Sequence, residues 1–170
     1  MKQAPRGRPS ARGLRVAIVR SLFNRPVTDG LLAGAREALA GMGAGEGRVE
    51  VYDLPGAFEL PLAAQAAART GRFDAVVALG AVIEGETDHY EHVAREAASG
   101  LAAVARETGV PVAFGVLTVR EEEHARRRAV PGPGNKGAEA ARAAVMTALA
   151  LREIGKGRPG RRRLSARRGR

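Results

Sequence analysis

Two of the chain's three histidines, His89 and His92, stand three residues apart just after an apolar run. The run, LGAVI at residues 79–83, predicts a buried strand, and the residues from Asp88 onward predict a helix. His89 would lie in the first helical turn, where the positive end of the helix dipole favours a neutral imidazole. A general base needs this neutral form near pH 7, so His89 is the candidate for proton transfer. His92, three residues further along the helix, is expected at the surface or in packing.

Metal binding is the alternative chemistry for these histidines. A catalytic zinc ion keeps three protein ligands, and the chain contains no cysteine. The third histidine, His124, lies in a different segment among Glu and Arg residues. The pattern therefore favours proton transfer, and we predict no metal site.

Gly85, Glu86 and Thr87 separate the predicted strand from the predicted helix. Backbone N–H groups at a helix start, with the Thr87 hydroxyl and the helix dipole, can bind an anion. The alternative is an ordinary helix cap, in which Asp88 at the N-cap and Glu91 three residues later form a capping box. Both interpretations remain open from the sequence alone.

The positive charge of the chain is concentrated at its two ends. The net charge is +10, yet residues 13–154 hold 16 basic and 18 acidic side chains. Residues 1–12 carry four basic side chains and residues 155–170 carry eight, with no acidic ones. Segments so rich in Gly, Pro and Arg bury little apolar surface, so we expect disordered tails that bind polyanions weakly. A nucleic-acid-binding module is the alternative, but the slightly acidic body argues for one globular domain over residues 13–154.

Composition excludes several classes of protein. The absence of cysteine excludes disulfides and thiolate nucleophiles, and it fits a reducing compartment. The chain has no run of about 18 apolar residues, and its first residues lack the apolar centre of a secretory signal. We therefore expect no membrane span and a cytoplasmic location.

Strand-like and helix-like segments alternate through the body of the chain. Apolar or alternating runs predict strands at residues 14–19, 48–54, 74–80 and 112–119. Helical spacing predicts helices at residues 30–43, with Thr28 or Asp29 as cap, and at 59–71, 88–108, 121–129 and 134–155. This order predicts a three-layer α/β/α sandwich with a four-stranded parallel sheet, which is flavodoxin-like. Ligands of such sheets bind beyond the carboxyl ends of the strands.

Two glycine-rich stretches lack the features of phosphate-binding motifs. GMGAGEG at residues 41–47 follows a helix and precedes a strand, which is the reverse of a dinucleotide-binding turn. GPGNKG at residues 132–137 lacks the P-loop spacing and the following Ser or Thr. The second stretch precedes a helix, so it is either a helix cap or an assembly contact.

Four motifs in one order make the chain resemble a known family. RSLFN, LPGAFELP, LGAVIEGETDHYEHV and PGNKG resemble lumazine synthases over about residues 13–154. This family of transferases condenses 5-amino-6-(D-ribitylamino)uracil with 3,4-dihydroxy-2-butanone 4-phosphate, in the penultimate step of riboflavin biosynthesis. The product is 6,7-dimethyl-8-(D-ribityl)lumazine. The resemblance implies small-molecule substrates and neither cofactor nor metal.

The resemblance also implies roles for single residues. Phe23 would stack on the pyrimidine, and the backbone of Ala81, Val82 and Ile83 would read the uracil edge. The remaining residues expected to bind the pyrimidine or its ribityl chain are Asn24, Ala57, Phe58, Glu59 and Phe114, the last supplied by a neighbouring subunit.

The resemblance assigns the phosphate to Glu86, Thr87 and Arg128, and proton transfer to His89. Arg128 is chosen by its distance from GNKG, and Arg127 is the alternative if the register differs by one residue. Glu84 departs from the family, which frequently has Arg, Lys or Gln there. A carboxylate would oppose phosphate binding, so we expect Glu84 to point outward or to pair with a basic neighbour.

The resemblance further implies a homo-oligomer whose active sites are shared between subunits. The family includes homopentamers and icosahedral shells of 60 subunits. The loop before GNKG is short, as in shell-forming members, but Pro131 and Pro133 stiffen it. An assembly that has kept the fold and lost the chemistry is the alternative.

Overall fold

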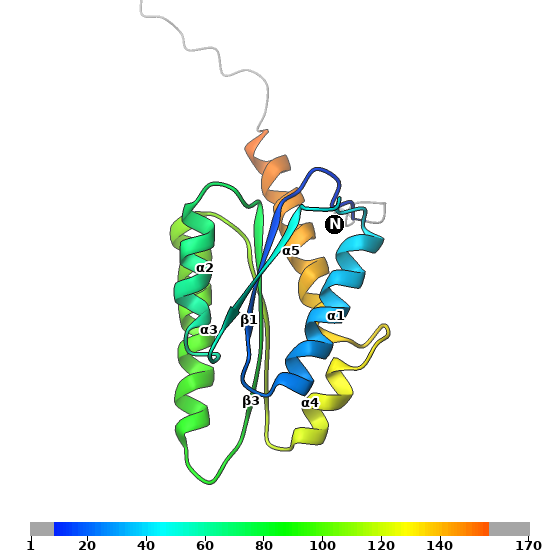
Figure 1. Cartoon of the computed structure of the whole chain (residues 1–170). Coiled ribbons are helices and arrows are strands. Elements are labelled where there is room, and N and C mark those ends of the chain that lie inside the picture. Colours follow the sequence, from blue (N-terminus) through cyan, green and yellow to red (C-terminus); the bar gives the residue numbers. More distant parts are fainter. Residues whose placement is uncertain (1–8, 157–170) are drawn as a thin grey trace, which may run out of the picture.

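A four-stranded parallel sheet with the order β2-β1-β3-β4 forms the middle layer of the protein (Figure 1). The computed structural model describes residues 9–156. All of β1 and all but the last residue of β3 are buried, because both faces of these two strands are covered, and this explains their apolar sequences. The strands are β1 (Val16–Ser21), β2 (Val49–Leu54), β3 (Ala75–Ile83) and β4 (Val112–Val119).

Within residues 9–156, five helices cover the two faces of the sheet (Figure 1). One face carries α1 (Arg25–Gly41), α4 (Glu122–Ala129) and α5 (Lys136–Gly155). The other face carries α2 (Leu60–Arg69) and α3 (His89–Thr108). Each face has its own apolar core, one centred on residues such as Leu31, Val77 and Val145 and the other on residues such as Leu60, Val76 and Leu101. The predicted three-layer α/β/α fold is confirmed.

The strand order reverses its direction between β1 and β3. The chain leads from β1 through α1 to β2 on one side, and from β3 through α3 to β4 on the other. The ladder between β1 and β3 ends at the pair Arg20 and Leu79, whereas β3 stays paired with β4 as far as Ile83. A crevice at such a switch point is the usual ligand site of open α/β sheets.

The first helix begins earlier than the sequence predicts. It starts at Arg25, and its N-cap is Asn24 in the left-handed conformation, with φ 56° and ψ 46°. The N–H groups of Val27 and Thr28 donate to the Asn24 carbonyl at 2.9 and 3.1 Å. The predicted cap at Thr28 or Asp29 is wrong, because Pro26 is well tolerated in a first turn and lets the helix begin before it.

Asn135 fixes the start of α5 against α1 and α4. Its side-chain oxygen accepts a hydrogen bond from the Ala138 N–H at 3.0 Å, so the GPGNKG stretch acts as a helix cap. Its amide nitrogen donates to the carbonyls of Gly30, Ala129 and Val130 at 2.9–3.1 Å. Helices α5 and α1 are also in direct contact, since a Cβ atom on Gly137 would overlap the carbonyl oxygen of Leu31.

The packed region begins before Gly13. Ala11 is completely buried, and its N–H donates to the Met42 carbonyl at 2.8 Å. The expected disorder of residues 1–12 therefore does not extend to Ala11, whose small apolar side chain joins the core while Arg12 stays exposed. Residues 1–8 and 157–170 of the two expected tails lie outside the described residues, whereas Gly155 ends α5 and Lys156 is its C-cap. Between residues 9 and 156, every helix is too short or too polar to cross a bilayer.

Candidate active site

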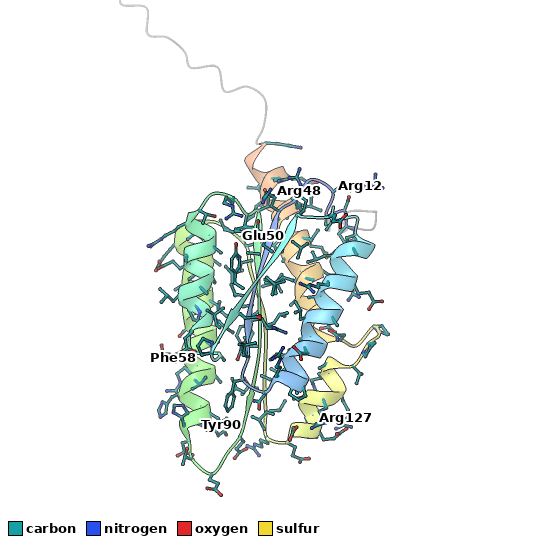
Figure 2. The ribbon with its side chains drawn as sticks, viewed as in Figure 1. Arg12, Arg48, Glu50, Phe58, Tyr90 and Arg127 are labelled. Atoms are coloured by element: carbon teal, nitrogen blue, oxygen red, sulfur yellow. The ribbon has the colours of Figure 1, made fainter. Side chains whose placement is uncertain are left out.

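A cavity of about 400 Å³ lies at the carboxyl ends of β1, β2 and β3, beside the start of α3. This size suits a small-molecule ligand. Figure 2 shows Phe58 and Tyr90 at this end of the molecule. The cavity is lined by Phe23, Gly56, Ala57, Phe58, Glu59, Ala81, Val82, Ile83, Gly85, Thr87, His89, Tyr90 and Val93.

A larger hollow, of about 540 Å³, lies between α1, α5 and the loop at residues 132–133. Among residues 9–156, its charged side chains are Glu37 and Arg142, and it contains none of the residues that the motifs assign to substrates or proton transfer. Volume alone is therefore a poor guide here. The cavity beside α3 combines a carboxylate, a histidine and a hydroxyl with aromatic rings, and it is the better candidate for chemistry.

The segment after β1 forms one wall of the cavity. Phe23 is 69% exposed, so its ring offers an apolar surface for a flat ligand. The Phe23 N–H donates to the Ser21 hydroxyl at 3.2 Å. On either side of Phe23, the Leu22 N–H donates to the Leu54 carbonyl and the Asn24 side chain donates to the Ala81 carbonyl, both at 2.8 Å.

The segment after β2 forms a second wall. Ala57 is buried, whereas the Phe58 ring is 58% exposed. Glu59 is the N-cap of α2, and its backbone carbonyl accepts from the Ala63 N–H at 3.2 Å. The carboxylate of Glu59 is the acidic group of the cavity, and it can accept hydrogen bonds from the hydroxyls of a polyol chain.

The end of β3 and the turn after it complete the cavity. Gly85, Thr87 and His89 line it, and His89 is the first residue of α3. Asp88 is the N-cap residue, but its side chain makes no capping hydrogen bond, and only its backbone carbonyl accepts from the Glu91 N–H. The capping box, which was the alternative interpretation of this turn, is therefore not formed. No side chain within residues 9–156 caps this helix start, so the N–H groups of His89 and Tyr90 can bind an anion.

Charged groups near the turn are arranged away from the cavity. Glu84 pairs with Arg120 at 3.6 Å, which confirms the expected pairing with a basic neighbour. Burial raises the pKa of Tyr90, and the carboxylates of Glu84 and Glu91 raise it further. The Tyr90 phenol therefore stays protonated at neutral pH. It adds a neutral polar group to the cavity.

Comparisons with known proteins agree with this geometry. Residues 13–152 match the sequence model of 6,7-dimethyl-8-ribityllumazine synthase. A protein named 6,7-dimethyl-8-ribityllumazine synthase, from Anaeromyxobacter dehalogenans (strain 2CP-C), is 52% identical over 142 residues. The match covers 84% of this chain and 88% of that relative. The chain belongs to the 6,7-dimethyl-8-ribityllumazine synthase family.

The cavity contains nine of the residues that the lumazine synthase motifs assign to the site. They are Phe23, Ala57, Phe58, Glu59, Ala81, Val82, Ile83, Thr87 and His89. His92 is exposed and does not line the cavity, although it is in the same helix as His89. Sequence reasoning missed Gly56, Tyr90 and Val93, whereas Gly85 belongs to the turn that it considered for anion binding. Val93 could have been found, because it lies four residues after His89 and so on the same face of α3.

Four assigned residues do not line this cavity. Asn24 is adjacent to it, with its amide bound to the Ala81 carbonyl. Glu86 is exposed in the turn between Gly85 and Thr87. Phe114 is 48% exposed on the edge strand β4, where it lines a separate hollow against α5.

Arg128, the fourth, lies on α4, which packs on the opposite face of the sheet from α3. Figure 2 shows its neighbour Arg127 there. Arg126 and Arg127 pair with Glu122 and Glu123 at 2.6 and 3.8 Å. Arg128 has no carboxylate partner within residues 9–156, and its guanidinium donates to the His124 carbonyl at 2.9 Å.

Proposed function

We propose that the cavity beside α3 is where this lumazine synthase family member forms 6,7-dimethyl-8-(D-ribityl)lumazine. The reaction joins 5-amino-6-(D-ribitylamino)uracil to 3,4-dihydroxy-2-butanone 4-phosphate, and it is a transferase step of riboflavin biosynthesis. One observation carries the proposal: nine of the 13 residues that line the cavity are those that the family motifs assign to substrates or proton transfer.

The pyrimidine would lie against the ring of Phe23. Stacking on an exposed aromatic ring suits a flat heterocycle. The backbone at Ala81–Ile83, at the end of β3, would bind the uracil edge. The ribityl chain would lie along residues 57–59, where the Glu59 carboxylate accepts hydrogen bonds from its hydroxyls. The phosphate of the second substrate would lie at the start of α3, held by the Thr87 hydroxyl and the first-turn N–H groups.

The chemistry needs positioned substrates and one group that transfers protons. An amine of the pyrimidine attacks the ketone, phosphate and water leave, and the second amine closes the ring with loss of another water. Holding two reactants in line supplies much of such a rate enhancement. His89 lines the cavity close to Thr87, so its imidazole can transfer protons where the phosphate leaves.

Phe114 and Arg128 would complete the cavity of a neighbouring copy of the chain. Both are exposed side chains outside this chain's own cavity. Phe114 lies in a hollow with Glu139 and Ala143 of α5, and Met146, three residues after Ala143, is 48% exposed on the same helix face. An exposed apolar edge of this kind suits contact between subunits. We propose a homopentamer, or a shell of 60 subunits built from pentamers.

Residues 13–154 would carry this activity as one domain, with basic tails that bind polyanions weakly. The absence of cysteine fits a reducing compartment, so we place the enzyme in the cytoplasm.

A turnover assay with both substrates tests the function. Product formation is compared with the same mixture without protein, because the reaction proceeds slowly unaided. We expect turnover well above this background. A rate equal to the background would show that the fold has lost its chemistry. Light scattering on the same sample measures the mass, and a monomeric mass at micromolar concentration would contradict the shared active site.

A further inference from the structure

The crevice between β1 and β3 ends in a single side-chain contact. The ladder between the two strands stops at the pair Arg20 and Leu79, four residues before the end of β3. Beyond Leu79, backbone groups on this edge of β3 have no strand partner on the β1 side. The amide nitrogen of Asn24 donates to the Ala81 carbonyl at 2.8 Å, and so continues the pairing by one step beyond the ladder.

Backbone alternation shows which groups face this crevice. The Glu84 N–H donates to the Val119 carbonyl of β4 at 2.9 Å, so the backbone groups of Glu84 point away from β1. Since alternate residues of a strand present their N–H and C=O groups to opposite neighbours, those of Ala81 and Ile83 point toward β1. The contact of Asn24 with the Ala81 carbonyl agrees with this alternation. The backbone that borders the cavity is therefore held directly by the Asn24 side chain.

Asn24 makes this contact from an unusual backbone conformation. Within residues 9–156 it is the only non-glycine residue with a positive φ, at 56°. Asn adopts the left-handed conformation more readily than other side chains do. The same residue is the N-cap of α1, yet its side chain makes no capping hydrogen bond to the helix. Its amide is committed to β3 instead of the helix start.

Two hydrogen bonds, one from Leu22 and one from Asn24, join three parts of the cavity. The Leu22 N–H holds the segment after β1 to Leu54, just before the second wall, and Asn24 holds it to Ala81. Phe23 lies between these two ties. The ring of Phe23 and the end of β3 are therefore held at a fixed distance. Of these two hydrogen bonds, only the one from Asn24 depends on a side chain.

We infer that Asn24 is a positioning residue for the pyrimidine substrate, and that it acts through Phe23 and the backbone at Ala81–Ile83 without contributing a free amide of its own. This inference rests on the proposed function, because it takes these groups as the pyrimidine site. It assigns no role at the phosphate end of the cavity, which is built by the start of α3.

Two variants separate the side chain from the backbone conformation. Asn24→Gly keeps the left-handed conformation and removes the amide. Asn24→Asp keeps the shape and places a carboxylate against the Ala81 carbonyl. Thr70→Ala is the matched control, because it removes a side-chain hydrogen bond to a backbone carbonyl, that of Ala67 at 2.7 Å, at the far end of α2.

The experiment measures KM for each substrate, together with Kd for the pyrimidine alone by calorimetry and Tm. For Asn24→Gly we expect KM and Kd for the pyrimidine to rise about five- to tenfold, which corresponds in free energy to the loss of one hydrogen bond. The KM for the butanone phosphate should stay within about twofold of the wild-type value. Asn24→Asp should have at least as large an effect. Thr70→Ala should leave both KM values unchanged.

The outcomes distinguish this inference from the proposed function. Unchanged pyrimidine binding in an active Asn24→Gly protein would overturn the inference alone. Equal increases in both KM values, with a large fall in Tm, would show a merely structural role and would also overturn it. Absence of turnover in the wild-type protein would overturn the proposed function, and the inference with it.

Discussion

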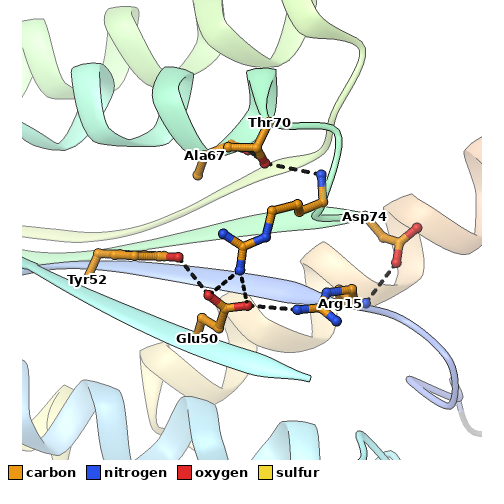
Figure 3. A network of polar contacts seen from close by, with 7 residues as sticks. Arg15, Glu50, Tyr52, Ala67, Thr70 and Asp74 are labelled. Atoms are coloured by element: carbon orange, nitrogen blue, oxygen red, sulfur yellow. Dashed lines mark hydrogen bonds and ion pairs between the residues drawn. The ribbon is translucent and has the colours of Figure 1, made fainter. Parts of the chain in front are cut away.

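The two ends of the sheet use the same kinds of polar side chain in opposite ways. At the amino ends of the strands, arginines and carboxylates bind each other in one network (Figure 3). Glu50 accepts hydrogen bonds from Arg15 and Tyr52 at 2.8 Å and from Arg72 at 2.6 and 2.7 Å. Asp74 accepts from the Arg15 backbone N–H at 2.8 Å, and also from Arg152 near the end of α5.

At the carboxyl ends, Arg20 also pairs with Asp53 and Asp29, but most of the polar side chains that line the cavity have no such partners within residues 9–156. Of the hydrogen bonds and ion pairs within residues 9–156, none involves the side chains of Glu59, Thr87 or His89, although all three line one cavity. Two aromatic rings, Phe23 and Phe58, are also more than half exposed there. An unused hydrogen-bonding group has no benefit for folding, so the difference separates a network that stabilises the sheet from a cavity that is kept for a ligand.

Arg128→Ala tests whether the ligand end is completed from outside the chain, and it should have the largest effect. We expect kcat/KM to fall about 30- to 1000-fold, because a charge-assisted contact to phosphate is lost. Binding of the pyrimidine alone should change little. Arg127→Ala is the matched control, since Arg127 already pairs with Glu123. A larger effect from Arg127 would mean that the register is wrong by one residue.

His89→Ala tests which histidine belongs to the ligand end. Turnover should slow about ten- to a thousandfold, with the lower values reflecting how much of the catalysis is positioning. His92→Ala, the control on the same helix, should turn over almost normally, and chelators should have no effect. Loss of activity on chelation would indicate a metal site instead.

Glu50→Gln tests the stabilising end, and its expected effect is smaller and of a different kind. We expect Tm to fall by about 2–4 °C, because one carboxylate joins Arg15, Tyr52 and Arg72. The kcat/KM of the purified protein at 25 °C should stay within about twofold of the wild type. A strong loss of activity without a change in Tm would contradict the division between the two ends.

Lowering the pH should remove the difference in stability between Glu50→Gln and the wild type. The hydrogen bond from Tyr52 and the pairing with Arg72 and Arg15 lower the pKa of Glu50. A lowered pKa in the folded state stabilises the protein above the ordinary glutamate value of about 4.3, and this stabilisation is lost as the pH falls through the folded-state pKa. The difference in Tm between wild type and Glu50→Gln should therefore have its maximum value at pH 7 and become smaller below about pH 4. A difference that grows in acid would contradict this assignment.

The sequence predicts the layers of this fold well because hydrophobic periodicity fixes them. Residues 112–119 are found as β4 without change, and the last helix ends at Gly155 as predicted. Local motifs likewise predict nine cavity residues, since each lies at the carboxyl end of a strand or in the segment that follows one. The start of α1 was missed because the left-handed Asn24 has no signal in hydrophobic spacing. Tyr90 was missed because a cavity wall on a helix face depends on tertiary packing, whereas Val93 shares a helix face with His89 and could have been found.

Contacts between distant segments could not be predicted from the sequence. Nothing in the residues around Asp88 indicates that its carboxylate leaves the helix start uncapped. The same holds for the pairing of Asn24 with Ala81, which joins residues 57 positions apart. The proposed part of Phe114 and Arg128 in the cavity of a neighbouring copy depends on assembly, which local pattern does not encode.

The close contact of α5 with α1 at Gly137 limits how this protein can vary. A methyl group there would meet the backbone of Leu31, and one at Gly34 would meet the Asn135 side chain. A side chain that is too large can often turn aside, but a carbonyl of a helix can move only if the helix moves. Substitution at Gly137 would therefore push the two helices apart and widen that whole layer. The spacing between these helices is set by the absence of one carbon atom, and the many alanines along α5 cannot compensate for its addition.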